Sequence, residues 1–158
     1  MRIDTCTKCE RAEDRKKLVL QKIEQSDILV IIDAPSIQDG ISGVPLSRIE
    51  DKIIYRYIKR YFPRKKVYVL CCVLCSSVKD LSIKHMTHCQ NNILLIIEKV
   101  NPDTIIFMNK KIEKFYRKIY KKAFRIIDPR LAKYNPALLP LINTSFERIK
   151  YYVKSENN

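Results

Sequence analysis

Hydrophobic residues along the chain occur either in short unbroken runs or at helical spacing, and the two patterns alternate. Unbroken runs rich in β-branched residues occupy positions 28–32, 67–74 and 104–108, and such runs are typical of strands buried on both faces of a parallel sheet. Helical spacing occupies positions 47–62 and 89–100 and predicts a last helix from about position 145. Positions 12–25 predict a short helix or irregular cover, and positions 125–127 a fourth strand. This alternation predicts a three-layer α/β/α fold around a mostly parallel four-stranded sheet.

The chain has the length and hydrophobic content of one domain. Its 158 residues are 46% hydrophobic, which is enough to fill one core. Because it contains no repeat and no Gly/Ser-rich linker, we expect residues 1–158 to form a single domain. The apolar runs are too short to span a bilayer, and the polar amino terminus does not resemble a secretory signal. We therefore expect a cytoplasmic protein with no membrane partner. Heavy use of Lys, Ile, Tyr and Asn indicates an AT-rich genome of microbial, plasmid or viral origin.

Positive charge dominates the composition. The chain has 31 Lys and Arg against 17 Asp and Glu, a formal net charge of +14, which favours nucleic acid over an acidic membrane as partner. Helical spacing continues over positions 109–125, where one face is apolar and the other is basic, interrupted only by Glu113. A solvated outer face is the alternative, but such faces usually mix charges. The predicted DNA-binding residues are Lys110, Lys111, Lys114, Arg117, Lys118, Lys121, Lys122 and Arg125.

Six cysteines suggest a metal centre, since thiols in a reducing compartment bind metals or pack as core residues more often than they form disulfides. Cys6 and Cys9 form a CxxC pair, and Cys75 and Cys89 follow far downstream. From spacing alone, zinc, an iron–sulfur cluster and the absence of any metal all stay open. At least one of the two cysteines at positions 71 and 72 should be ordinary core, because both lie inside a predicted strand.

Two histidines near Cys89 offer further metal ligands. His85 and His88 lie in the sequence "HMTHC" and could serve zinc. Exposed loop histidines without a metal role are the commoner case, and we favour that interpretation for both.

The order of several short motifs resembles the family 4 uracil-DNA glycosylases over nearly the whole chain. The segments are "CTKC", "IDAPS", "GVPL", "CCVLC", Cys89, "NPDTIIFMN" and "NPALL". Each motif is degraded, and the resemblance rests on their order and spacing. It implies a uracil-DNA glycosylase-like α/β/α fold. It also implies that Cys6, Cys9, Cys75 and Cys89 ligate a structural 4Fe-4S cluster, which favours iron–sulfur over zinc.

The resemblance also assigns catalytic positions, and both are altered. Asp33 stands where the family has the glutamate that activates water or positions the base. Asn135 stands where the family has the histidine that stabilises the departing uracil anion. A shorter carboxylate loses water alignment, and a neutral amide is a weaker substitute for that histidine.

The base pocket implied by the resemblance keeps residues that shape its loop but lacks the side chains that recognise the base. Leu46 replaces the phenylalanine on which uracil stacks, Cys71 replaces the asparagine that reads the uracil edge, and Ser36 replaces a glycine. Leucine offers no aromatic face, and cysteine cannot replace a bidentate amide. The implied base-pocket residues are Ala34, Pro35, Ser36, Leu46 and Cys71.

These substitutions predict little or no base excision, because the loss of one such group costs a factor of about 10² to 10³ in rate. We expect an inactive or attenuated iron–sulfur, DNA-binding member of the superfamily, acting in replication, repair or transcription assemblies. One alternative is an active glycosylase that excises uracil or another deaminated base from a rebuilt pocket, using Asp33 and Asn135. A second alternative is a scaffold subunit that binds a protein partner through the segment "YNPALLPLI".

Overall fold

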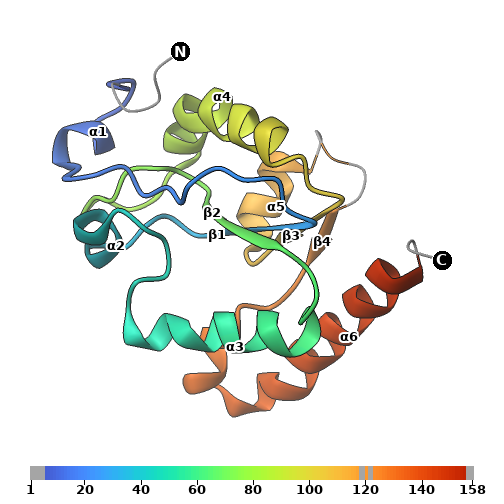
Figure 1. Ribbon diagram of the computed structural model, residues 1–158. Coiled ribbons are helices and arrows are strands. Elements are labelled where there is room, and N and C mark those ends of the chain that lie inside the picture. Colours follow the sequence, from blue (N-terminus) through green and yellow to red (C-terminus); the bar gives the residue numbers. More distant parts are fainter. Residues whose placement is uncertain (1–5, 118–119, 121–122, 156–158) are drawn as a thin grey trace.

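The protein is built on a four-stranded sheet in which every strand runs parallel to its neighbours. The computed structural model describes residues 6–117, 120 and 123–155. The sheet order is β2-β1-β3-β4 (Figure 1). The strands are β1 (Ile28–Ile32), β2 (Val67–Cys71), β3 (Thr104–Phe107) and β4 (Ala123–Arg125). The predicted parallel four-stranded sheet is therefore confirmed.

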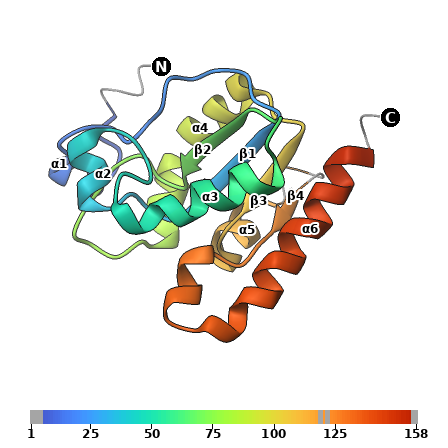
Figure 2. The same ribbon diagram turned by 60° about the horizontal axis from the view of Figure 1, so that its bottom comes forward.

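Helices cover both faces of this sheet and give three layers. Helices α3 (Lys52–Tyr61) and α6 (Leu139–Ser155) lie on one face, and α4 (Ile83–Val100) and α5 (Lys110–Tyr116) lie on the other (Figures 1 and 2). All five side chains of β1 are buried. They alternate between the two layers, because successive side chains of a strand point to opposite faces. The three-layer prediction is confirmed.

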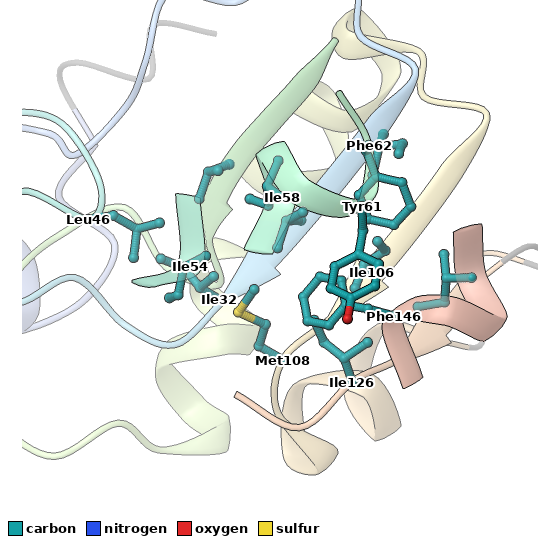
Figure 3. Close-up of a cluster of buried hydrophobic side chains, with 14 of the residues drawn as sticks. Ile32, Leu46, Ile54, Ile58, Tyr61, Phe62, Ile106, Met108, Ile126 and Phe146 are labelled. Atoms are coloured by element: carbon teal, nitrogen blue, oxygen red, sulfur yellow. The ribbon is translucent and has the colours of Figure 1, made fainter. Parts of the chain in front are cut away.

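Aromatic packing joins the two helices of the first layer. The rings of Tyr61 in α3 and Phe146 in α6 stack with their centroids 5.1 Å apart (Figure 3). The Tyr61 hydroxyl donates a hydrogen bond to Asn143 Oδ1 at 3.1 Å. Stacked aromatic pairs stabilise a fold by more than the burial of their surface alone. The stack and the hydrogen bond therefore hold α6 against α3 and position the segment that precedes α6.

Short elements complete the chain, and two long helices begin earlier than predicted. Helix α4 begins at Ile83 because Ser82 caps it, accepting a hydrogen bond from the His85 backbone amide. Helix α6 begins at Leu139 and not near position 145. The short elements are α1 (Arg11–Asp14), α2 (Ile37–Ser42), η2 (Ile49–Asp51), η3 (Pro129–Lys133) and η4 (Pro136–Leu138). None of the helices in the described part of the chain has the length and apolarity that crossing a membrane requires.

The predicted continuous basic helix over positions 109–125 is wrong. Helix α5 ends at Tyr116, and residues Ala123–Arg125 form β4, in register with β3. The apolar stripe is correct within the helix, since Ile112 and Tyr116 are buried. Beyond it, parallel pairing with a buried strand satisfies the backbone and overrides the helical spacing.

Candidate functional site

A cluster of charged and polar side chains lies beyond the carboxyl ends of β1 and β3, where open parallel sheets usually place their ligands. Asp33 follows β1 directly, and Asn109 follows β3 as the N-cap of α5. The Asn109 side chain donates a hydrogen bond to Asp33 Oδ1 at 2.8 Å. Its carbonyl accepts from the Lys111 backbone amide at 2.7 Å. The cap of one element therefore orients the carboxylate that follows the other.

Arg130 links this carboxylate to two others. Its guanidinium donates to Asp51 Oδ1 at 2.8 Å and binds the carboxylate of Asp128 through Nε at 3.0 Å. It also lies 3.9 Å from Asp33 Oδ2. Arg48 forms a second fork on Asp51, with contacts of 3.0 and 3.1 Å. These pairs hold two arginines and three aspartates in one network.

Two hollows meet at this network. The larger has a volume of about 650 Å³ and the smaller about 300 Å³. Both are lined by Asp33, Arg48 and Arg130, so we treat them as one cleft. The other residues of the larger hollow are Ile49, Glu50, Ile53, Asp128, Leu131, Lys133 and Tyr134. Those of the smaller hollow are Ile32, Ala34, Ser36, Asp39 and Leu46.

The cleft shifts the acidity of its central groups. Burial raises the pKa of Asp33, and Asp128 adds to this, while Arg130 and the hydrogen bond from Asn109 oppose it. Burial works against the charge of Arg130, but Asp128 and Asp51 outweigh it, so the pKa of Arg130 lies above its ordinary value. A carboxylate with a raised pKa in a cleft is typical of functional sites, although structural networks also produce it.

The loop after β1 owes its shape to Asp39. One Asp39 carboxylate oxygen accepts hydrogen bonds from the backbone and hydroxyl of Ser36, both at 2.8 Å. The other accepts from Ser47, at 2.8 Å from its backbone and 2.7 Å from its hydroxyl. Helix α2 ends at Ser42 and is capped by Gly43, whose φ of 82° favours glycine. Asp39 therefore closes the loop between Ser36 and Ser47 around the smaller hollow.

The structure brings together most of the predicted pocket residues. Ala34, Ser36 and Leu46 line the smaller hollow with Asp33. Leu46 has a φ of 58°, a conformation uncommon for leucine. Pro35 is buried next to them but does not line either hollow.

Two predicted residues lie elsewhere. Cys71 is fully buried in the core at the end of β2, and burial raises the pKa of its thiol well above the ordinary value. Asn135 is exposed, caps η4 by accepting a hydrogen bond from the Ala137 backbone amide at 3.2 Å, and lines neither hollow. The side chain that reaches toward Asp33 from this region is Arg130 instead.

Sequence reasoning missed Arg130, its partner Asp51, and Asn109. A signal was present in "DPR", since an acid and an arginine two residues apart follow the last strand of a parallel sheet. No pattern indicated Asp51, because a loop and a helix boundary separate it from the strand ends, and only packing brings it to Arg130.

The four cysteines assigned by the resemblance meet at a second site. Cys6, Cys9, Cys75 and Cys89 line one small cavity of about 20 Å³, together with His88. All six cysteines of the chain are free thiols. Burial raises the pKa of the Cys89 thiol to about 12 and that of Cys75 above its ordinary value.

Arginines hold the amino-terminal segment at this cavity. Arg11 is fully buried and donates to the backbone carbonyls of Cys75 at 3.1 Å and Lys79 at 2.6 Å. Arg15 donates to the Cys75 sulfur at 3.8 Å. Both cations would complement anionic thiolates, since a neighbouring positive charge favours the charged form of a thiol.

The histidines are not the exposed loop residues that we expected, because both lie in α4. His85 is buried, accepts from the Ser82 backbone amide through Nδ1 at 3.1 Å, and lies 2.8 Å from Glu10 through Nε2. It therefore helps to tie the amino-terminal segment to α4. His88 Nδ1 and Asn92 Oδ1 are buried without a hydrogen-bond partner among the described residues, and both residues line the cysteine cavity.

The four cysteines at this cavity have the chemistry to bind a metal centre as thiolates. The cavity, however, is too small to hold such a centre unless its walls move. In the part of the chain that the structure describes, no three Cys, His, Asp or Glu side chains are arranged to hold a metal ion. A cavity of 20 Å³ is about the size of one water. A cluster would therefore require the cysteines around this cavity to move apart. The unpaired polar atoms of His88 and Asn92 are the kind that an additional bound group explains.

The predicted DNA-binding face on α5 is partly neutralised. Glu113 pairs with Arg117 at 2.8 Å and with Arg125 at 3.1 Å. Lys110, Lys111 and Lys114 are exposed. The remaining three predicted residues, Lys118, Lys121 and Lys122, lie outside the described residues.

Neither the models of known protein families nor the curated proteins contain a match to this chain.

Proposed function

We propose that this chain is a DNA-binding protein that holds a 4Fe-4S cluster and has little or no base-excision activity. The observation that carries the proposal is the convergence of Cys6, Cys9, Cys75 and Cys89 on one cavity from three separate parts of the chain. Thiols gathered in this way outside a disulfide suit a metal centre. The net charge of +14 supports a polyanionic partner.

The four cysteines would ligate the iron atoms, and the cluster would serve as a covalent link between the amino terminus and the sheet. Arg11 holds the amino-terminal segment against the loop after β2, and Arg15 contacts the Cys75 sulfur. These two residues orient the ligands and offset negative charge on the thiolates.

The residues that line the cleft support the proposal that the protein has little or no base-excision activity. Asp33 is engaged by Asn109 and faces Arg130, and Leu46 supplies an aliphatic wall in place of an aromatic one. Cys71 is buried in the core, and neither Cys71 nor Asn135 lines the cleft, so neither is placed to hydrogen-bond a base there. Among the cleft residues, Arg130 is the best candidate to offset a developing anion, and it is already bound to two carboxylates.

An anaerobic preparation tests the cluster. We expect about four iron and four labile sulfide per chain with a brown colour, and the loss of both in Cys89→Ala. Cys72→Ala is the matched control, because Cys72 is a buried core cysteine that does not line the cavity. A content of one zinc per chain without sulfide would show that the site binds zinc and not a cluster. Equal metal content in the two variants would show that Cys89 is not a ligand.

A titration with duplex DNA tests the partner. We expect log affinity to fall linearly with log salt, with a slope of about −0.9 for each phosphate neutralised. Uracil-containing duplex should yield no abasic sites with the cluster-loaded protein. Affinity that is absent even at low salt would overturn the DNA-binding proposal, and efficient uracil release would overturn the inactive one.

An active glycosylase is the second candidate, because Asp33 lies in the cleft with a raised pKa. In this case Asp33 would orient water, and Arg130, in place of Asn135, would stabilise the leaving base after it flips from the duplex. A panel of duplexes with uracil, hypoxanthine and other altered bases tests it. Release of one base that is abolished by Asp33→Asn, with DNA affinity unchanged, would establish this candidate.

The scaffold alternative has one observation in its favour. The segment around η4 exposes Tyr134, Leu139 and Leu141, and exposed apolar groups that cluster mark contact surfaces. Binding of DNA by the purified chain alone would argue against an obligatory partner.

A further inference from the structure

The outward face of α3 carries a row of cations that the sequence patterns did not single out. Lys52, Arg56, Lys59 and Arg60 are all exposed. Lys52, Arg56 and Arg60 recur every four residues, so they lie along one side of the helix about 6 Å apart. In Figure 2, α3 lies in front of the sheet, and no helix or strand crosses in front of it.

These cations are not neutralised by neighbouring acids. None of the four has an ion pair among the residues that the structure describes, whereas Glu113 pairs with both arginines near α5. The acids before α3 are already engaged, since Glu50 and Asp51 both pair with Arg48. The adjacent part of α6 contributes Glu147, Arg148 and Lys150, so it adds more positive than negative charge.

The row is costly to the helix itself. Like charges four residues apart on a helix repel each other, and this row contains two such pairs, Lys52 with Arg56 and Arg56 with Arg60. A face that only keeps a protein soluble usually mixes both signs. An anionic partner would relieve this repulsion.

The other side of α3 excludes a membrane as the simplest partner. Ile54, Ile58 and Tyr61 are buried in the core against the sheet and α6. Helices that bind a bilayer surface need an apolar face that enters it, and α3 has none to offer. A row of exposed cations with no free apolar face suits a phosphate backbone instead.

The row begins next to the cleft. The wall of the larger hollow includes Glu50 and Ile53, which flank Lys52 in the sequence, and it includes the exposed Lys133. Helix α3 leads away from this wall on the sheet face opposite to α5 (Figures 1 and 2). A strand of nucleic acid that lay along α3 would therefore pass the mouth of the cleft.

We propose that the outward face of α3, through Lys52, Arg56 and Arg60, is the surface that contacts the phosphate backbone of DNA. The proposal rests on the proposed DNA binding and replaces α5 as its main surface. It makes no use of the cluster or of activity in the cleft.

The test compares variants that remove equal charge from different faces. Lys52→Gln/Arg56→Gln/Arg60→Gln should weaken duplex binding and make the salt slope shallower by about 2.7, since each phosphate contact contributes about 0.9. The matched control is Lys16→Gln/Lys84→Gln/Lys99→Gln, which removes three exposed cations elsewhere and should change the slope by less than about 1. Lys52→Arg/Arg56→Lys/Arg60→Lys should keep the wild-type slope.

Three other outcomes would contradict the assignment of this surface to DNA. An equal loss in both neutralised variants would mean that only net charge matters, and a loss confined to Lys110→Gln/Lys111→Gln/Lys114→Gln would return the surface to α5. Binding of anionic vesicles through the α3 row, with DNA binding unaffected, would make the surface a membrane contact. Wild-type protein without DNA affinity would instead overturn the proposed function. If the triple variant does not fold, Arg56→Gln alone should reduce the slope by about 0.9.

Discussion

Asp39 shows how much one buried carboxylate decides at the scale of a single residue. Its burial works against its charge, but the four hydrogen bonds from Ser47 and Ser36 outweigh that effect, so the pKa of Asp39 lies below its ordinary value. The sequence motif drew attention to Asp33, six positions earlier, because it follows the strand. Asp33 faces the cleft, while Asp39 builds the loop that borders it.

Asp39→Asn should therefore destabilise the protein by roughly 2–4 kcal/mol at neutral pH, because charge-assisted hydrogen bonds are lost from a buried site. The folded pKa is lowered, so the stabilisation is complete above the ordinary pKa of aspartate and disappears as the pH falls through the folded value. Urea unfolding at neutral pH and below about pH 4 measures both effects.

The exposed Asp80 provides the control for this substitution. Asp80→Asn should leave the free energy of unfolding nearly unchanged. If both variants lost stability equally, or if the gap between wild type and Asp39→Asn persisted in acid, the assigned role of Asp39 would be wrong.

At the scale of elements, close contact fixes α2 against the loop that follows β2. A methyl group at Gly40 would lie 1.8 Å from Ser76 Oγ and 2.7 Å from its Cβ. The second glycine, Gly43, is required for a different reason, its left-handed backbone at the end of α2. The two glycines of the chain thus serve packing and conformation separately.

Gly40→Ala should cost about 1–3 kcal/mol by overpacking. Ser76→Gly removes both clashing atoms, so the double variant should recover part of that loss. A double-mutant cycle with urea unfolding measures the coupling, expected between about 0.5 and 3 kcal/mol. Strict additivity of the two substitutions would show that the contact does not decide the packing.

Glu113 links α5 to β4, because its carboxylate pairs with Arg117 at the end of α5 and with Arg125 at the end of β4. Glu113→Gln should destabilise the protein by up to about 1 kcal/mol, because its partners are largely exposed. Glu98→Gln in α4 removes an exposed carboxylate and should have almost no effect. High salt should reduce the difference between the two variants, which thermal unfolding at two salt concentrations would reveal.

At the scale of the whole molecule, several contacts attach the amino-terminal segment to the loop after β2 and to α4. Arg11 supplies two hydrogen bonds, and Leu18 forms an isolated antiparallel bridge with Cys75. If a cluster joins this segment to Cys75 and Cys89, it closes a long loop and restricts the unfolded chain as a covalent cross-link does.

Removal of iron from the loaded protein should therefore lower its stability. By analogy with cross-links of similar loop length we expect roughly 4–5 kcal/mol, which corresponds to a fall in Tm of about 8–20 °C. Thermal unfolding before and after anaerobic chelation measures this. Cys89→Ala should resemble the iron-free protein and gain nothing from iron, whereas an unchanged Tm on chelation would contradict the linking role.

The sequence by itself determined the sheet and its layers. Short unbroken apolar runs rich in β-branched residues are typical of strands buried on both faces of a sheet, and helical segments between them indicate parallel strands joined by crossover helices. Strands β1, β2 and β3 were predicted within a few residues for this reason. The helix prediction was wrong after Tyr116, because it used only local spacing. The pairing of Ala123–Arg125 with β3 is a contact between residues distant in the sequence.

Only the tertiary structure decided what the chemistry-bearing residues do. Asp51 and Arg130 meet because η3 packs against α3, the helix that follows η2, and no local pattern encodes that contact. Asn135 lies in the expected motif, but its side chain accepts a hydrogen bond from the Ala137 backbone amide, and Cys71 is buried in the core. The four cysteines were identified by type and order, yet their meeting at one cavity depends on how the amino terminus folds back over β2 and α4. Side-chain identity limits what a site can do, and long-range packing selects which side chains share it.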